Sequence, residues 1–132
     1  DVCSSDLADT IATLHGTVKI GLICNTGFTG GDPLRTVLEI HGLARYFDVL
    51  TFSNEFGYLK PDPRIFQHTL ERLGVDPSEA LHVGDLEEAD VTGARGAGMF
   101  AARYAPDAED GTEGHLLVRH WREFPSQIAS LA

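Results

Sequence analysis

Acidic side chains gather in residues 81–90, which read LHVGDLEEAD. Asp85 directly follows a short apolar run and a glycine, and Asp90 lies five residues further on, where a helical pattern begins. Open α/β sheets hold their ligands at the carboxyl ends of the strands, and Mg²⁺ prefers carboxylate oxygens. Asp85 and Asp90 are therefore candidate magnesium ligands, and Gly84 would let the backbone approach a ligand closely. The alternative is local, because aspartates also cap turns and helices.

Lys60 is the second candidate for chemistry. It precedes the sequence Pro-Asp-Pro, whose prolines restrict the local backbone. A rigidly held ammonium beside carboxylates can neutralise a phosphoryl group or a nucleophilic aspartate. A lone lysine is more often solvated, but this Lys-Pro-Asp-Pro setting favours the catalytic interpretation.

Three residues end the apolar run of residues 18–24 or follow it: Cys24, Asn25 and Thr26. Backbone N–H groups and side-chain donors of such a loop can hold phosphate oxygens. Cys24 is a weak donor and has no evident base to make it a nucleophile. We therefore expect Asn25 and Thr26 to supply most of the polar contacts to phosphate.

Apolar runs typical of strands alternate with helical patterns along the chain. The alternation predicts an α/β fold, with a Rossmann-like parallel sheet, helices on both faces and right-handed crossovers. Asp6, Asp32 and Asp62 are expected helix N-caps, and a proline follows each of the last two. Residues 53–59 are expected to be irregular. The predicted strands are 18–24, 47–52, 81–84, 99–104 and 116–118, and the predicted helices are 7–14, 33–41, 63–73, 90–97 and 121–131.

The bulk properties narrow the class of protein. A chain of 132 residues fits one domain, and its formal charge of −10 argues against nucleic acid or an anionic membrane as a partner. No apolar run approaches the ~18 residues that a membrane span needs. The two cysteines lack metal-ligand spacing, so a cytoplasmic protein is the default interpretation. The six histidines, including His82 within a predicted strand, show no zinc-like spacing and are expected to be structural.

Three separated segments resemble motifs of the haloacid dehalogenase-like hydrolase superfamily. Residues 20–26, the KPDP of residues 60–63, and the VGD of residues 83–85 with Asp90 are similar to its second, third and fourth motifs, in that order. The resemblance extends over about residues 7–104. It implies an aspartyl nucleophile that forms a phospho-aspartate, which water then hydrolyses with the help of Mg²⁺.

The resemblance also implies a role for each candidate residue. Lys60 would stabilise the charged intermediate, and Asp85 with Asp90 would serve the metal. Cys24 stands where the family usually has a serine or threonine that contacts phosphate, so that contact would pass to Asn25 or to backbone amides. Dehalogenases of the superfamily tend to have Ser or Asn in place of Asp85, which favours the phosphatase type.

The first motif of the superfamily, an apolar strand followed by Asp-x-Asp, has no counterpart in this sequence. In the family that strand is central, between the strands that end here at Cys24 and Gly84. The cap that selects the substrate is absent as well. The resemblance thus predicts that residues 1–132 form a partial core domain. Separately, residues 1–6, with no Met and no apolar strand before the first helix, are expected to be foreign or disordered, and the acidic residues 105–114 are expected to form a flexible loop.

Two functions follow as expectations. The first is a Mg²⁺-dependent phosphatase of small phosphorylated metabolites whose nucleophile lies outside these residues, so that the chain alone is inactive. The alternative is a non-catalytic binding or regulatory domain that keeps the fold without the nucleophile. The upstream coding sequence would separate them, since an apolar strand with Asp-x-Asp supports the enzyme.

Overall fold

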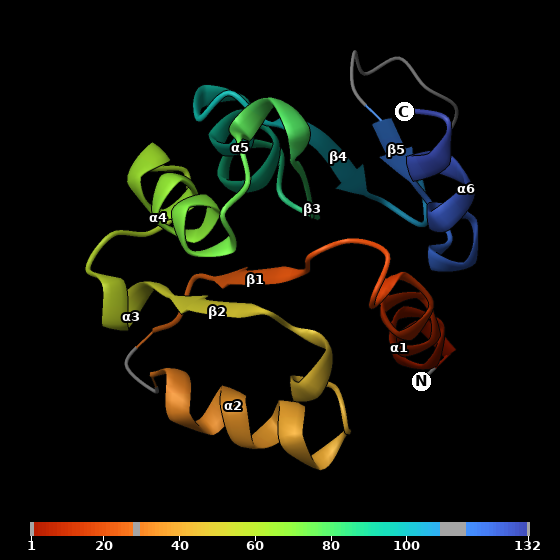
Figure 1. Ribbon diagram of the computed structural model, residues 1–132, viewed down its shortest axis with the longest axis horizontal. Coiled ribbons are helices and arrows are strands. Elements are labelled where there is room, and N and C mark those ends of the chain that lie inside the picture. Colours follow the sequence, from red (N-terminus) through yellow and green to blue (C-terminus); the bar gives the residue numbers. More distant parts are fainter. Residues whose placement is uncertain (1, 28–29, 109–115, 132) are drawn as a thin grey trace.

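The computed structural model describes residues 2–27, 30–108 and 116–131 as an alternation of strands and helices. Figure 1 shows their arrangement. The strands are β1 (Gly21–Cys24), β2 (Val49–Phe52), β3 (Leu81–Gly84), β4 (Phe100–Tyr104) and β5 (Leu116–Val118). The α-helices are α1 (Val2–Leu14), α2 (Gly31–Ile40), α3 (Ser53–Phe56), α4 (Pro63–Leu73), α5 (Gly93–Gly96) and α6 (Phe124–Ala129). Shorter elements are the 3₁₀-helices η1 (Ala44–Tyr46), η2 (Pro77–Glu79) and η4 (Trp121–Glu123), and the π-helix η3 (Glu87–Thr92).

The described strands are all parallel, but they form two sheets. β1 pairs with β2, and β3, β4 and β5 form the other sheet in that order. Within the described residues, β1 and β3 each have one strand partner. The predicted α/β class with parallel strands is confirmed. The break in the sheet falls between the two strands that the family resemblance places beside a central strand.

Helix α4 positions the loop that precedes it. Its N-cap is Asp62, whose Oδ1 accepts a hydrogen bond from the Arg64 backbone N–H at 2.9 Å, and Pro63 is its first residue, as predicted. Ile65 and Phe66 are fully buried on its inner face, in a core shared with η3, α5 and the start of β4. Figure 1 shows α4 on one side of the β1–β2 pair and α2 on the other.

Three local expectations were wrong. Helix α1 already begins at Val2, so Asp6 lies inside it instead of capping it. Helix α2 begins at Gly31 and has Gly30 as N-cap, with φ 78°, so Asp32 falls within the first turn. Residues 53–56, expected to be irregular, form α3, which is too short to show a helical sequence period.

Two regions that the sequence marked as foreign, disordered or flexible are only partly described. Residues 2–6 belong to α1, whereas residue 1 lies outside the described residues. Of the acidic loop at 105–114, residues 105–108 form a turn and the remainder lies outside the described residues.

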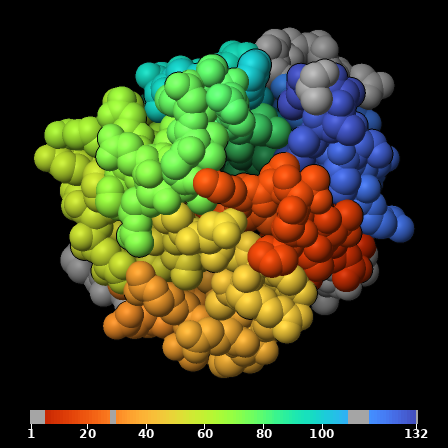
Figure 2. All heavy atoms as spheres, viewed as in Figure 1, coloured from red at the N-terminus to blue at the C-terminus, as the bar shows by residue number. Residues whose placement is uncertain are grey.

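The first and last helices pack against each other. Thr10, buried in α1, donates from Oγ1 to the Trp121 carbonyl at 2.8 Å. The Trp121 ring stacks on Tyr104 with centroids 4.6 Å apart, over a core that contains Val118 and Phe124. Figure 2 shows the α1 residues, in red, against the blue carboxyl-terminal segment. Among the described residues, no helix is long and apolar enough to cross a membrane.

Candidate active site

The centre of the candidate site is the buried carboxylate of Asp90, whose side chain is 3% exposed. Its Oδ1 lies 2.6 Å from Lys60 Nζ and 3.0 Å from His82 Nε2. Its Oδ2 accepts a hydrogen bond from the Leu86 backbone N–H at 3.0 Å. The carboxylate thus joins the loop before α4, the strand β3 and the loop after β3.

These contacts decide the charge of Asp90. Burial alone would raise the pKa of this carboxyl group, because a charged group loses its hydration. Hydrogen bonds from His82, Lys60 and the Leu86 N–H, together with the positive charge of Lys60, outweigh burial and hold the pKa of Asp90 well below its usual range. Asp90 is therefore ionised and forms a buried ion pair with the lysine.

Gly84 leaves the space that Asp90 occupies. A Cβ atom at Gly84 would collide with the carboxylate carbon and Oδ2 of Asp90. The absence of a side chain at Gly84 therefore makes room for Asp90, a residue of the same chain. The backbone of η3 directs Asp90 towards this space, because the N–H groups of Asp90 and Val91 both lie near the Leu86 carbonyl, at 3.0 and 3.3 Å. The wider π-helical turn is a feature found at many functional sites.

Lys60 is fixed by its backbone as well as by its ammonium. The Lys60 N–H donates to Asn25 Oδ1 at 2.8 Å, and Asn25 Nδ2 donates to the Lys60 carbonyl at 3.1 Å. The Lys60–Pro61 peptide bond is cis, and Gly93 has no Cβ that would press on Pro61 and Phe66. The side chain of Lys60 is 12% exposed. Asn25 therefore connects the end of β1 to the lysine loop.

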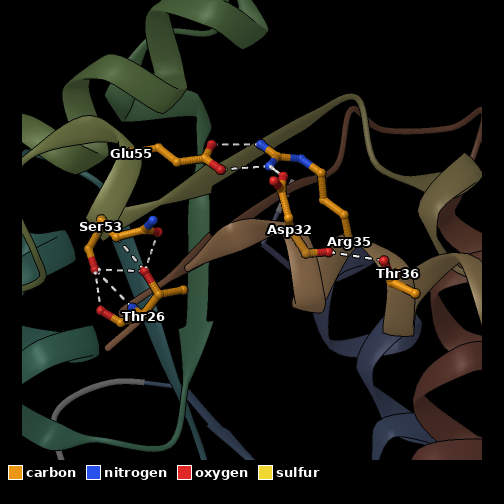
Figure 3. Close-up of polar contacts among 7 residues, drawn as sticks. Thr26, Asp32, Arg35, Thr36, Ser53 and Glu55 are labelled. Carbon is orange, nitrogen blue, oxygen red and sulfur yellow. Dashed lines mark hydrogen bonds and ion pairs between the residues drawn. The ribbon is translucent and has the colours of Figure 1, made fainter. Parts of the chain in front are cut away.

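Thr26 contacts the start of α3 (Figure 3). Its N–H donates to Ser53 Oγ at 2.8 Å, and its hydroxyl donates to Asn54 Oδ1 at 2.6 Å. The Ser53 hydroxyl also approaches the Thr26 carbonyl at 3.2 Å. Both donors of Thr26 are thus used within the protein. The half-buried thiol of Cys24 lies 3.8 Å from the Asn25 carbonyl.

An ion pair also connects α2 to α3, and Figure 3 shows it beside Thr26. Arg35 donates to both carboxylate oxygens of Glu55, at 2.6 and 2.7 Å, and to Asp32 at 3.1 Å. The hydrogen bonds to Glu55 raise the pKa of Arg35 above its usual value, and they lower the pKa of Glu55. Helix α3 therefore holds the loop after β1 at Thr26 and the helix that follows the loop at Arg35.

Asp85 differs from Asp90 in its exposure to solvent. It is exposed and lies just beyond the end of β3. Among the described residues, no group of three or more His, Cys, Asp or Glu side chains could hold a metal ion. The two predicted metal ligands are thus one open carboxylate and one that is already engaged by Lys60 and His82.

The structure brings part of the predicted site together. Lys60, Asp90 and Asn25 are connected by hydrogen bonds, whereas Thr26 contacts α3 and Asp85 faces solvent. His82 was expected to be structural, and its contact with Asp90 was missed. The available signal was a polar residue within an otherwise apolar strand.

The sequence is similar to those of known proteins. The model of the haloacid dehalogenase-like hydrolase family matches residues 3–98. The chain is 44% identical over 117 residues to the pyrimidine 5'-nucleotidase YjjG of Escherichia coli, covering 88% of this chain and 45% of that protein. It is 50% identical over 70 residues to the phosphoserine phosphatase of Thermus thermophilus, covering 53% and 28%.

The fold agrees with these sequence matches. A solved HAD phosphatase from Thermococcus onnurineus has a TM-score of 0.82 at 34% identity, over 93% of this chain and 56% of that one. The matched part of this chain spans less than half the length of the two curated relatives, the nucleotidase and the phosphoserine phosphatase. The family model covers well over half of this chain, and the sequence therefore belongs to the haloacid dehalogenase-like hydrolases.

Proposed function

We propose that this chain forms the carboxyl-terminal part of the core of a Mg²⁺-dependent, cytoplasmic phosphatase that acts on small phosphorylated metabolites through a phospho-aspartate. The observation that carries the proposal is the position of Lys60, whose ammonium is held by Asp90 and whose backbone is held by Asn25, next to the carboxyl ends of β1 and β3. A preorganised cation stabilises the negative charge of a transferring phosphoryl group without reorganising during the reaction. The names of the two curated relatives support a phosphate ester as substrate.

The nucleophile would come from a strand between β1 and β3. Strands at the centre of parallel sheets are buried on both faces. The residues of β3 are only half-buried, and so are Leu22, Ile23 and Cys24 of β1. A parallel apolar strand inserted there would pair with both and carry an aspartate to the edge where Lys60 lies. Lys60 would then neutralise the acyl phosphate as it forms.

Asp85 fits the role of a magnesium ligand, because its carboxylate is exposed at the end of β3. Asp90 does not fit as a direct ligand in this arrangement, since a metal ion would displace Lys60 or His82 from Oδ1 or the Leu86 N–H from Oδ2. Mg²⁺ often keeps several waters and binds one or two carboxylates together with substrate phosphate. Bound there, the ion would neutralise phosphoryl oxygens. Asp90 would serve it through water and would hold the lysine.

Phosphate would meet few side-chain donors in the loop after β1. The Asn25 side chain already bonds the Lys60 backbone through one amide hydrogen and its carbonyl oxygen. Both donors of Thr26, its backbone N–H and its hydroxyl, are already bonded to residues of α3. We therefore assign phosphate binding mainly to Lys60, with the Asn25 backbone N–H and its second amide hydrogen beside it. Cys24 contributes little, because a thiol is a weak donor.

Hydrolysis of an aryl phosphate tests the proposal. The protein extended upstream through the Asp-x-Asp strand should turn over the ester with Mg²⁺, and a chelator or Asp85→Asn should reduce the rate sharply. The 132-residue chain alone should give no turnover. Undiminished hydrolysis without Mg²⁺, or turnover by the 132-residue chain, would refute it. An upstream sequence without Asp-x-Asp would favour the non-catalytic alternative.

A further inference from the structure

The three donors to Asp90 come from different kinds of backbone. Lys60 and Leu86 lie in loops, whereas His82 is in the middle of strand β3, where its register partner is Ala101 of β4. Side chains on strands hold a site more precisely than side chains on loops. Of the three groups around the carboxylate, His82 is thus the one that the sheet itself positions.

The imidazole ring of His82 is itself held in place by a neighbouring aromatic ring. The His82 side chain is 12% exposed, and its ring meets the Phe66 ring edge to face, with centroids 5.0 Å apart and planes at 88°. Phe66 is fully buried on α4 and has little freedom to move. The contact fixes the direction in which His82 presents Nε2 to Asp90, 3.0 Å away.

The hydrogen bond defines the tautomer of the ring. An ionised carboxylate only accepts hydrogen bonds, so Nε2 must carry the hydrogen that lies between His82 and Asp90. Without the His82 donor, Oδ1 of Asp90 would accept a hydrogen bond from the Lys60 ammonium alone. The carboxylate could then turn about its side-chain bonds, and Lys60 would move with it.

We propose that His82 is a positioning residue that fixes the ammonium of Lys60 by holding Asp90 from strand β3. The catalytic consequence rests on the proposed function, because it matters only where Lys60 meets a phosphoryl group. The positioning itself needs no substrate. Its failure and that of the phosphatase proposal are therefore separate results.

Lysine NMR of the 132-residue chain provides the test. The sequence has two lysines, Lys60 and the exposed Lys19, so each ammonium signal is assigned by one substitution and Lys19 serves as an internal reference. In the unchanged chain, the Lys60 ammonium hydrogens should exchange with water at least about tenfold more slowly than those of Lys19, because they are buried against a charge. Asp90→Asn should remove most of that protection.

The variants of His82 separate positioning from packing. His82→Leu should speed exchange at Lys60 by about tenfold and leave Lys19 unchanged, the size expected for a lost hydrogen bond to a charged group. His82→Gln, which places an amide N–H near the position of Nε2, should restore protection to within about threefold. Unchanged Lys60 exchange in His82→Leu would overturn the proposal.

A measurement on the unsubstituted ring covers the case in which His82→Leu does not fold. The nitrogen spectrum of the histidine rings, with His82 identified by its loss in His82→Gln, should show a hydrogen on Nε2 of His82. A ring of the opposite tautomer, with its hydrogen on Nδ1 alone, could not donate to Asp90 and would overturn the proposal.

Discussion

Removing the ammonium of Lys60 should destabilise the fold by far more than a surface charge would. Lys60→Met keeps most of the side-chain length but leaves the buried Asp90 carboxylate with only His82 and the Leu86 N–H as donors. Deleting one partner of a buried ion pair typically costs about 3–5 kcal/mol. We expect the lower end, about 3 kcal/mol, because His82 and the Leu86 N–H continue to donate. Domains are stable by only ~5–15 kcal/mol, so the loss should be obvious in urea unfolding.

The loss of stability in Lys60→Met should depend on pH in a defined direction. The pKa of Asp90 in the folded chain lies below its unfolded value of ~3.9, so this group stabilises the fold above that pH, and the stabilisation is lost as the pH falls through the folded pKa. In Lys60→Met the pKa of Asp90 in the folded chain rises, because the carboxylate loses the hydrogen bond and positive charge of the lysine. The difference in the free energy of unfolding between the two chains should therefore be complete at neutral pH and shrink below about pH 4.

Metal-free urea titrations at about pH 7 and about pH 3 measure this difference. Lys19→Met is the matched control, because the exposed Lys19 ammonium donates to the Leu73 carbonyl at 2.7 Å and pairs with no carboxylate among the described residues. It should cost under about 1 kcal/mol at both pH values. A cost below about 1 kcal/mol for Lys60→Met, or one that is equal at the two pH values, would refute the buried-pair reasoning.

Three further substitutions test the neighbouring structure. Gly84→Ala should lower the free energy of unfolding by about 3 kcal/mol or more, because the new Cβ displaces the buried carboxylate. Gly96→Ala should not lower it, because a Cβ there meets no atom of the described residues within 4 Å. Asp62→Ala should lower the melting temperature by about 3–5 °C through loss of the α4 cap, and Asp32→Ala by under about 2 °C. Asn25→Ala should speed exchange of the Lys60 backbone amide hydrogen by about tenfold, whereas Asn25→Asp, which keeps the acceptor oxygen, should leave it unchanged. Equal effects within any of these pairs would contradict the corresponding contact.

Two of the Asp-Pro pairs, at residues 32–33 and 62–63, show how far local sequence predicts a helix start. The pair at residues 62–63 begins α4 as expected, since Asp62 caps the helix and the loop before it is held by Asn25. The same pair at residues 32–33 lies inside α2, because Gly30 adopts a positive φ and Gly31 packs against Phe52 and Glu55 where a Cβ would not fit. Tertiary packing moved that boundary, and the capping signal alone could not show it.

The sequence predicted that Lys60 lies beside a carboxylate, but it did not predict which other groups contact that carboxylate. The sequence placed Lys60 and Asp90 at the same edge, because strand ends and helix starts of βα units converge there. It named both Asp85 and Asp90 as metal ligands, since spacing along a chain does not show which carboxylate is buried. The contact with His82 depends on the π-helical turn and on Gly84, whose combined effect appears only in three dimensions.

The contact between Thr10 and Trp121 has a consequence for how quickly the chain folds. The two residues are 111 positions apart in the sequence, so this contact closes a loop that contains most of the chain. Contacts between distant segments slow folding, because a large loop must close before they stabilise anything. The unit of β1, β2 and α4 can form early from nearer segments. During synthesis, α1 must wait for η4 to emerge, and docking of these two elements should limit the rate at which the domain reaches its final form.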